Sequence, residues 1–137
     1  MKFNVGEWVM KPGVTSYNCE QIRQVRVAQD GKSVYLYAVS YRADVRGLDG
    51  PSLELTISSP RRDVLRVQAC HFRGSRAKMP SFELNDDALT LAIEQNETEL
   101  RVSSGEMTLE IAFRPCAFRF FYRGKRLTAV GDRFGSP

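Results

Sequence analysis

Three thiols and one imidazole are the side chains of this sequence best suited to nucleophilic or metal chemistry. Cys19, Cys70 and Cys116 lie far apart along the 137 residues, and His71 is the single histidine. Zinc sites built from Cys and His ligands commonly contain a CxxC-type pair, which this sequence lacks. We therefore expect no metal site. Because the cysteine count is odd and the first residues show no secretion signal, we also expect three unpaired thiols.

Acid–base or nucleophilic catalysis would need paired carboxylates, or a hydroxyl or thiol beside a base. His71 alternates in phase with Val67 and Ala69, which predicts a structural histidine pointing inward at a strand end. Asp86 and Asp87 lie in a loop-like stretch, where turn and capping roles are expected. The chain contains no P-loop, dinucleotide fingerprint or GxSxG nucleophile elbow. We therefore expect no catalytic, cofactor-binding or metal-binding residue, and no cofactor.

Positive charge gathers near the middle of the chain, within a net charge of +4. Such a cluster suits phosphate contacts, but acidic residues are spread through the rest of the sequence. A solvated turn and outer sheet face is therefore the favoured interpretation, and we expect no nucleic-acid partner. No apolar run approaches a membrane span of ~20 residues, so no membrane partner is expected. The basic cluster consists of Arg61, Arg62, Arg66, Arg73, Arg76 and Lys78.

Aromatic side chains recur at strand spacing. They offer stacking platforms for sugars or bases, but at this spacing they more often belong to a core or an interface. We favour the second interpretation and leave a carbohydrate open as a partner. In the most aromatic run, 118–122, Phe121 lies on the second face, and we expect this exposed patch to favour a homo-oligomer. The aromatic residues concerned are Tyr35, Tyr37, Tyr41, Phe118, Phe120, Phe121 and Tyr122.

The elements that must position these residues are short strands, organised around a hairpin at 52–74. Apolar and polar residues alternate from Ser52 to Ile57, which predicts a half-buried strand. Pro60 then breaks the strand, because proline cannot donate to a strand ladder. A second strand follows at 63–72, so the pair is expected to form the central antiparallel hairpin. Its buried face is predicted to carry Leu65, Val67 and Ala69, with Arg66 and Gln68 outside.

Further period-two runs flank the hairpin, and no window shows a sustained helical period with a cap. The phase slips between Ile22 and Val25, which predicts a β-bulge. Turns are predicted at Asp30-Gly31-Lys32, at Asn96 and at Ser104-Gly105. About ten short strands separated by turns predict an all-β antiparallel β-sandwich, with almost no helix and one domain over residues 1–137. The strand at 33–41 is predicted to be central and covered on both faces. The flanking runs are 3–10, 20–28, 33–41, 89–94, 100–103, 107–113, 117–122 and 126–130.

Four segments in the same order resemble the N-terminal domain of glycoside hydrolase family 31, which contains α-glucosidases and α-xylosidases. They are GEWVMKPG, VRGLDGPSLELTI with the following SSPRRDVLRVQACHFRG, then SSGEMTLEI, and finally FRFFYRGKRLTAVG. The closest likeness is to bacterial α-xylosidases. In that family this domain is a β-sandwich resembling galactose mutarotases, and it continues beyond the length seen here.

The resemblance implies a fragment of a larger retaining α-glycosidase whose two catalytic carboxylates, about 5 Å apart, lie on a (β/α)8 barrel. No catalytic residue carries over to this chain, so we expect a non-catalytic domain that packs against that barrel. Its main partner would be the remainder of the parent polypeptide. The N-terminus MKFNVGEWVM lacks the apolar region of a signal peptide, which makes the cytoplasm the expected location.

Two alternatives from other classes stay open. A free-standing closed β-barrel that binds a small ligand or carbohydrate would have a similar length. The breaks at Pro60 and Pro115 favour an open sandwich instead. A nucleic-acid-binding β domain would rest on the net charge and the aromatic residues, and salt-dependent binding of single-stranded DNA would support it.

Overall fold

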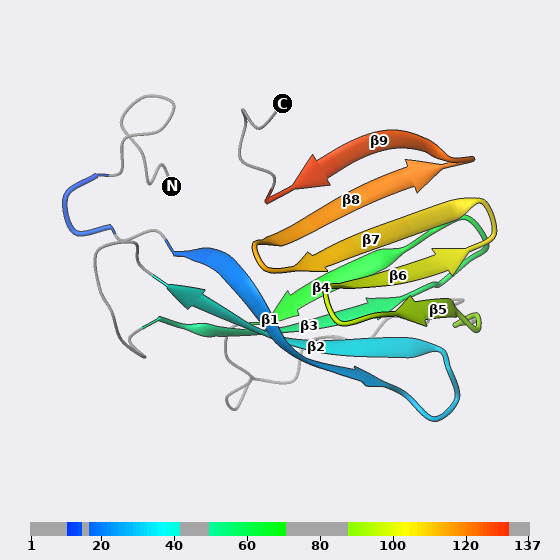
Figure 1. Ribbon diagram of the computed structural model, residues 1–137, viewed down its shortest axis with the longest axis horizontal. Coiled ribbons are helices and arrows are strands. Elements are labelled where there is room, and N and C mark those ends of the chain that lie inside the picture. The colour runs from blue at the N-terminus through cyan, green and yellow to red at the C-terminus, as the bar shows by residue number, and fades with distance from the viewer. Residues whose placement is uncertain (1–10, 15–16, 42–49, 71–87, 132–137) are drawn as a thin grey trace, which may run out of the picture.

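The computed structural model describes residues 11–14, 17–41, 50–70 and 88–131, and within them the chain forms two antiparallel sheets (Figure 1). The first sheet has the order β1-β2-β3-β4 and the second the order β5-β6-β7-β8-β9. The predicted β-sandwich is confirmed, and the described residues contain no helix. The strands are β1 Asn18–Val27, β2 Ser33–Tyr41, β3 Ser52–Ser58, β4 Arg66–Cys70, β5 Ala92–Gln95, β6 Glu99–Ser104, β7 Met107–Phe113, β8 Cys116–Tyr122 and β9 Lys125–Val130.

The predicted hairpin at 52–74 exists as the antiparallel pair β3 and β4, in which Leu55 lies opposite Ala69. Its predicted place at the centre is wrong for β4, which is an edge strand of the first sheet. Val67 is partly buried against the core, but Ala69 is exposed, contrary to the prediction. An edge strand has a neighbouring strand on one side only. Side chains near the end of β4, such as Ala69, are therefore covered by fewer neighbours than side chains on an inner strand.

β1 and β2 form the other hairpin of this sheet, joined by the predicted turn at Asp30-Gly31-Lys32. Gly31 has φ +66°, and the Lys32 amide donates to Asp30 Oδ1 at 3.0 Å. The predicted bulge is confirmed, because the register shifts between Ile22 and Gln24. β2 is an inner strand as expected, but Tyr37 is 42% exposed, so the prediction that both faces are covered is wrong.

The second sheet is a meander in which each strand pairs with the next (Figure 1). Its inner strand β7 carries Leu109 and Ile111, both fully buried, as the period-two stripe predicted. The strand predicted at 89–94 is shorter, since β5 begins at Ala92 and Leu89 is 37% exposed. The break predicted at Pro115 is confirmed by the turn between Phe113 and Cys116.

The hydrophobic core lies between the two sheets. Ile57 and Val34 from the first sheet and Leu100 and Val102 from the second are all fully buried and belong to one cluster. Neither sheet closes on itself or pairs with the other in the part of the chain that is described. The closed-barrel alternative is therefore wrong for these residues, because a barrel requires one continuous ladder.

Polar contacts also tie the sheets together at one end of the sandwich. Ser59, after β3, is fully buried, and its hydroxyl lies 2.6 Å from that of Ser104 at the end of β6. Ser59 Oγ also donates to the Arg61 carbonyl at 2.7 Å, so Ser104 is the donor between the two serines. Asp63 Oδ1 accepts from the Glu106 amide at 2.5 Å. The β3–β4 connection is thereby fixed on the β6–β7 turn.

Several predicted features lie outside the described residues. These are the strand at 3–10, the inward His71, and the carboxylates of Asp86 and Asp87. No helix among the described residues is long and apolar enough to cross a membrane.

Candidate ligand cleft between β1 and the β5–β6 turn

An open cleft of about 360 Å³ lies between β1 of the first sheet and the β5–β6 turn of the second. Ligand pockets in proteins span roughly 300–1,000 Å³, so this cleft is at the small end of that range. It is lined by Gln21, Ile22, Arg23, Gln24, Val25, Gln95, Asn96, Glu97, Thr98, Phe113 and Arg114.

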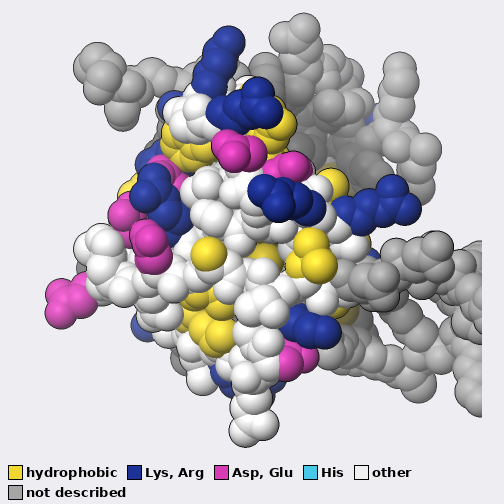
Figure 2. All heavy atoms as spheres, turned by 90° about the vertical axis from the view of Figure 1, so that its right-hand side faces the viewer, with side chains coloured by type: hydrophobic (Ala, Val, Ile, Leu, Met, Phe, Trp, Pro, Cys, Tyr) yellow, Lys and Arg dark blue, Asp and Glu magenta, His cyan; other side chains and the backbone are white. Residues whose placement is uncertain are grey.

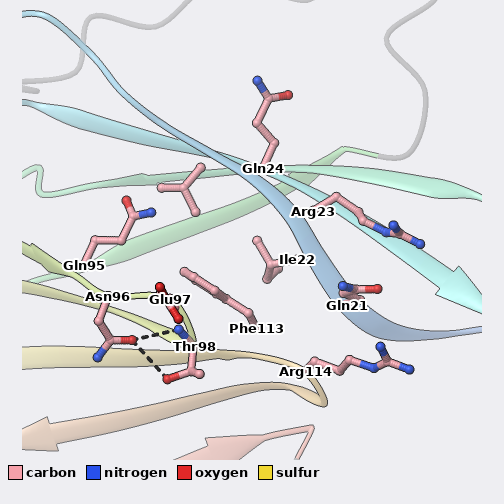
Figure 3. Close-up of a pocket in the computed structure, with 11 residues that line it drawn as sticks. Gln21, Ile22, Arg23, Gln24, Gln95, Asn96, Glu97, Thr98, Phe113 and Arg114 are labelled. Atoms are coloured by element: carbon pink, nitrogen blue, oxygen red, sulfur yellow. Dashed lines mark hydrogen bonds between the residues drawn. The ribbon is translucent and has the colours of Figure 1, made fainter.

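The floor of the cleft is apolar. Figure 3 shows the side chain of Ile22 pointing toward Phe113, which rises from the end of β7. Ile22 is 5% exposed, and Phe113 and Val25 are partly buried against the core. In an unbulged strand, residues three apart point to opposite faces. The bulge between Ile22 and Gln24 allows Ile22 and Val25 to pack on the same core.

The far wall is a rigid turn built around Asn96. Its Oδ1 accepts from the Thr98 amide at 2.8 Å and from the Thr98 hydroxyl at 3.0 Å (Figure 3). It also accepts from the Glu99 amide at 2.8 Å. The Thr98 carbonyl in turn accepts from the Phe113 amide at 2.9 Å. These bonds hold the turn against the end of β7. The wall is therefore largely formed before any ligand arrives.

The rim carries amides and charges of both signs. Gln95 ends β5, Glu97 lies in the β5–β6 turn, Gln21 comes from β1, and Arg114 follows β7 (Figure 3). Gln24 points away from the floor in the same view. Amides and a guanidinium can donate to and accept from hydroxyl groups, which suits a small polyhydroxylated ligand. Glycoside hydrolysis commonly uses two carboxylates. Among the described residues that line this cleft, Glu97 is the single acid.

The residues singled out by sequence do not converge on this cleft. Phe118 and Phe120 pack against the core, as the core interpretation predicted. Phe121 is partly buried, so the predicted exposed aromatic patch is wrong for this residue. Tyr35 lies under the Arg26 guanidinium, whose carbon is 4.9 Å from the ring centroid.

Half of the basic cluster, namely Arg73, Arg76 and Lys78, lies outside the described residues. Of the other three, Arg61 and Arg62 are exposed, while Arg66 is partly buried and donates from Nε to Ser58 Oγ at 3.1 Å. Figure 2 shows basic side chains with acidic ones among them on the face that contains the strand turns. This pattern agrees with the solvated-face interpretation of the charge.

Sequence reasoning missed the cleft, although two of its signals were visible. The phase slip at Ile22 and the turn at Asn96 were both recognised, but their proximity depends on how the sheets stack.

Sequence reasoning also missed the close approach of two thiols. All three cysteines are free, as predicted, yet Cys19 Sγ and Cys116 Sγ lie 3.0 Å apart. No metal-binding cluster of His, Cys, Asp and Glu occurs among the described residues.

Comparison with solved structures gives the class of fold. The chain resembles the cycloalternan-forming enzyme from Listeria monocytogenes, solved in complex with a pentasaccharide substrate. The TM-score is 0.58 at 17% sequence identity, over 82% of this chain and 9% of that chain. An uncharacterized protein from Listeria monocytogenes EGD-e, in complex with α-D-glucose, β-D-glucose, magnesium and calcium, matches with a TM-score of 0.58 and 17% identity.

Sequence comparison finds one similar stretch in a longer protein. The chain is 24% identical over 144 residues to an α-xylosidase of Emericella nidulans. The match covers 99% of this chain but only 18% of that protein. No protein-family model matches the chain. The predicted resemblance to a part of an α-xylosidase is confirmed, and the chain spans about a fifth of the length of that relative.

Proposed function

We propose that this chain is the non-catalytic β-sandwich domain of an enzyme that hydrolyses α-glycosidic bonds, and that it packs against a catalytic (β/α)8 barrel. The observation that carries this proposal is the match of nearly the whole chain to 18% of an α-xylosidase. The β-sandwich fold supports a structural rather than a catalytic role, and so does the presence of one acid, Glu97, among the described residues of the cleft.

Exposed apolar side chains on the last strand of the second sheet support a packing role. Leu127 and Val130 on β9 are 56% and 63% exposed, and β9 is an edge strand of its sheet within the described part of the chain. Exposed apolar residues along an unpaired strand edge are suited to contact with another segment. The remainder of the parent polypeptide is the partner that we propose for this edge.

The proposal is tested by the gene and by an activity assay. Reading the open reading frame past codon 137 should reveal a barrel with paired catalytic Asp residues, whereas a stop codon at that point would contradict the proposal. The 137-residue chain alone should show no turnover of an aryl α-xyloside above a buffer blank. The full reading frame should hydrolyse the α-xyloside, and faster hydrolysis of an aryl α-glucoside would favour the α-glucosidase assignment.

Two further features of the parent enzyme are proposals of the same kind. A cytoplasmic location is supported by three free thiols, since reducing compartments keep cysteines unpaired. Homo-oligomerisation would use the same apolar edge of β9 when no other segment covers it. Light scattering across a concentration series should show the isolated chain self-associating, and a strict monomer at high concentration would contradict that association.

A second candidate function is carbohydrate binding at the cleft. The amide and guanidinium groups around the apolar floor of Ile22 and Phe113 favour it. Titration with xylose and α-linked xylo- or gluco-oligosaccharides, followed by NMR, should perturb resonances of residues 95–98. Arg114→Ala should weaken the binding, while Arg61→Ala, at an exposed arginine outside the cleft lining, should not. Equal effects of the two substitutions would exclude the cleft as the binding site.

A further inference from the structure

Two thiols that are 97 residues apart in the sequence meet between the sheets. Cys19 lies on β1, the edge strand of the first sheet, and Cys116 is the first residue of β8 in the second. Their sulfur atoms are 3.0 Å apart, and β1 packs against β7 and β8 in this region. The two cysteines therefore join strands that no backbone ladder connects.

The environments of the two thiols differ in a way that suits stepwise oxidation. Cys19 is half-buried, so a small reagent can reach it, while Cys116 is 3% exposed. The contact with Cys116 lowers the pKa of Cys19, because the Cys116 thiol can donate to the Cys19 thiolate once that thiolate forms. The same contact and burial raise the pKa of Cys116. The accessible sulfur is thus the better nucleophile of the pair.

We propose that Cys19 and Cys116 form a reversible disulfide that staples the two sheets when the chain meets a small-molecule disulfide such as oxidised glutathione. The Cys19 thiolate attacks one sulfur of the reagent, breaks its S–S bond and releases one thiolate. Cys116 then loses its proton and attacks Cys19 Sγ, which forms the protein disulfide and releases the second thiolate. The protein gives up two electrons, and the reagent is reduced to two thiols.

Cys70 cannot replace either member of the pair without rearrangement of the fold. It lies on β4, at the opposite edge of the sheet that holds Cys19. Three strand spacings of about 4.8 Å separate β1 from β4, or about 14 Å in total. A disulfide requires Cα atoms within about 7 Å of each other. The geometry therefore assigns one specific pairing among the three cysteines.

The reduced full chain would be equilibrated with reduced and oxidised glutathione, quenched with acid, alkylated and digested without reduction. Mass spectrometry should find a linked peptide pair containing Cys19 and Cys116, lighter by two hydrogen atoms, with Cys70 alkylated. The Cys70→Ser variant should keep this product, and Cys19→Ser should lose it. Cys19 is the residue substituted because it is half-buried, whereas a change at the buried Cys116 risks the fold itself.

A second measurement detects the disulfide through its effect on stability. The guanidinium concentration at the unfolding midpoint should be higher for the oxidised chain than for the reduced chain, because the cross-link restricts the unfolded state. Cys19→Ser should show the same midpoint under both conditions. Three alkylated thiols, a link to Cys70, a glutathione adduct that persists on Cys19, or equal midpoints for the oxidised and reduced wild type would each overturn the proposal. This inference does not depend on the glycosidase assignment.

Discussion

Truncation of Leu109 tests whether the two-sheet core holds this chain together. Leu109 is fully buried at the middle of β7, opposite Val102 on β6 and Phe120 on β8. The Leu109→Ala substitution removes three carbon atoms, which at about 0.8 kcal/mol per buried methylene loses about 2.4 kcal/mol of transfer free energy. A cavity term adds to this loss when the surroundings cannot collapse.

Collapse around Leu109 is restricted because hydrogen-bonded strands flank it on both sides. We therefore expect Leu109→Ala to lower the free energy of unfolding by about 3–5 kcal/mol, within the usual range for a buried leucine. Small domains have only about 5–15 kcal/mol of stability, so the variant should unfold at a much lower denaturant concentration. Guanidinium titration followed by far-UV circular dichroism measures the change.

The matched control is Leu127→Ala on β9. Leu127 is 56% exposed, so its truncation should change the free energy of unfolding by no more than about 0.5 kcal/mol. Both variants remove the same atoms from strands of the same sheet. If the two substitutions have the same small effect, Leu109 does not occupy the core and the stacking of the sheets described here is wrong.

Three further predictions concern contacts that connect the two sheets. Gly105→Ala should lower the melting temperature more than Gly124→Ala does. Both glycines have positive φ, but a Cβ at Gly105 would overlap Asp63 Oδ1, whereas a Cβ at Gly124 would meet open space. Ser59→Ala should lower the free energy of unfolding by about 1–3 kcal/mol, because it removes the Ser59 hydroxyl to which the buried Ser104 hydroxyl bonds. An unchanged denaturation midpoint would refute this prediction. The alkylation rate of Cys19 should begin to fall at a lower pH in the folded chain than in the unfolded chain, because contact with Cys116 lowers the pKa of Cys19. Identical dependence of the rate on pH in the two states would contradict that contact.

Local pattern was sufficient to predict most strands and turns. Period-two alternation located β3, β6, β7 and β8, and glycine marked the turns at Gly31 and Gly105, where φ is positive. These predictions succeed because strand pleating and turn conformation depend on residues that are neighbours in sequence. The bulge in β1 was predictable for the same reason, since a phase slip is visible within one strand.

The tertiary structure decided the order of the strands and everything that depends on it. Alternation in β4 is compatible with an inner or an edge strand, and only pairing shows that β4 is an edge on which Ala69 is exposed. Likewise, Tyr37 alternates like a covered residue but faces the outside of the sheet. Period two separates the two faces of a strand, but it does not say which face another layer will cover.

The cleft and the thiol pair also combine features visible in the sequence with a proximity that only the tertiary structure decides. The sequence by itself supplied the phase slip at Ile22, the turn at Asn96, and the presence of Cys19 and Cys116. Only the stacking of the two sheets brought the first two together as a cleft and placed the two sulfurs 3.0 Å apart. Contacts between residues 97 positions apart depend on the packing of whole layers, which no local periodicity encodes.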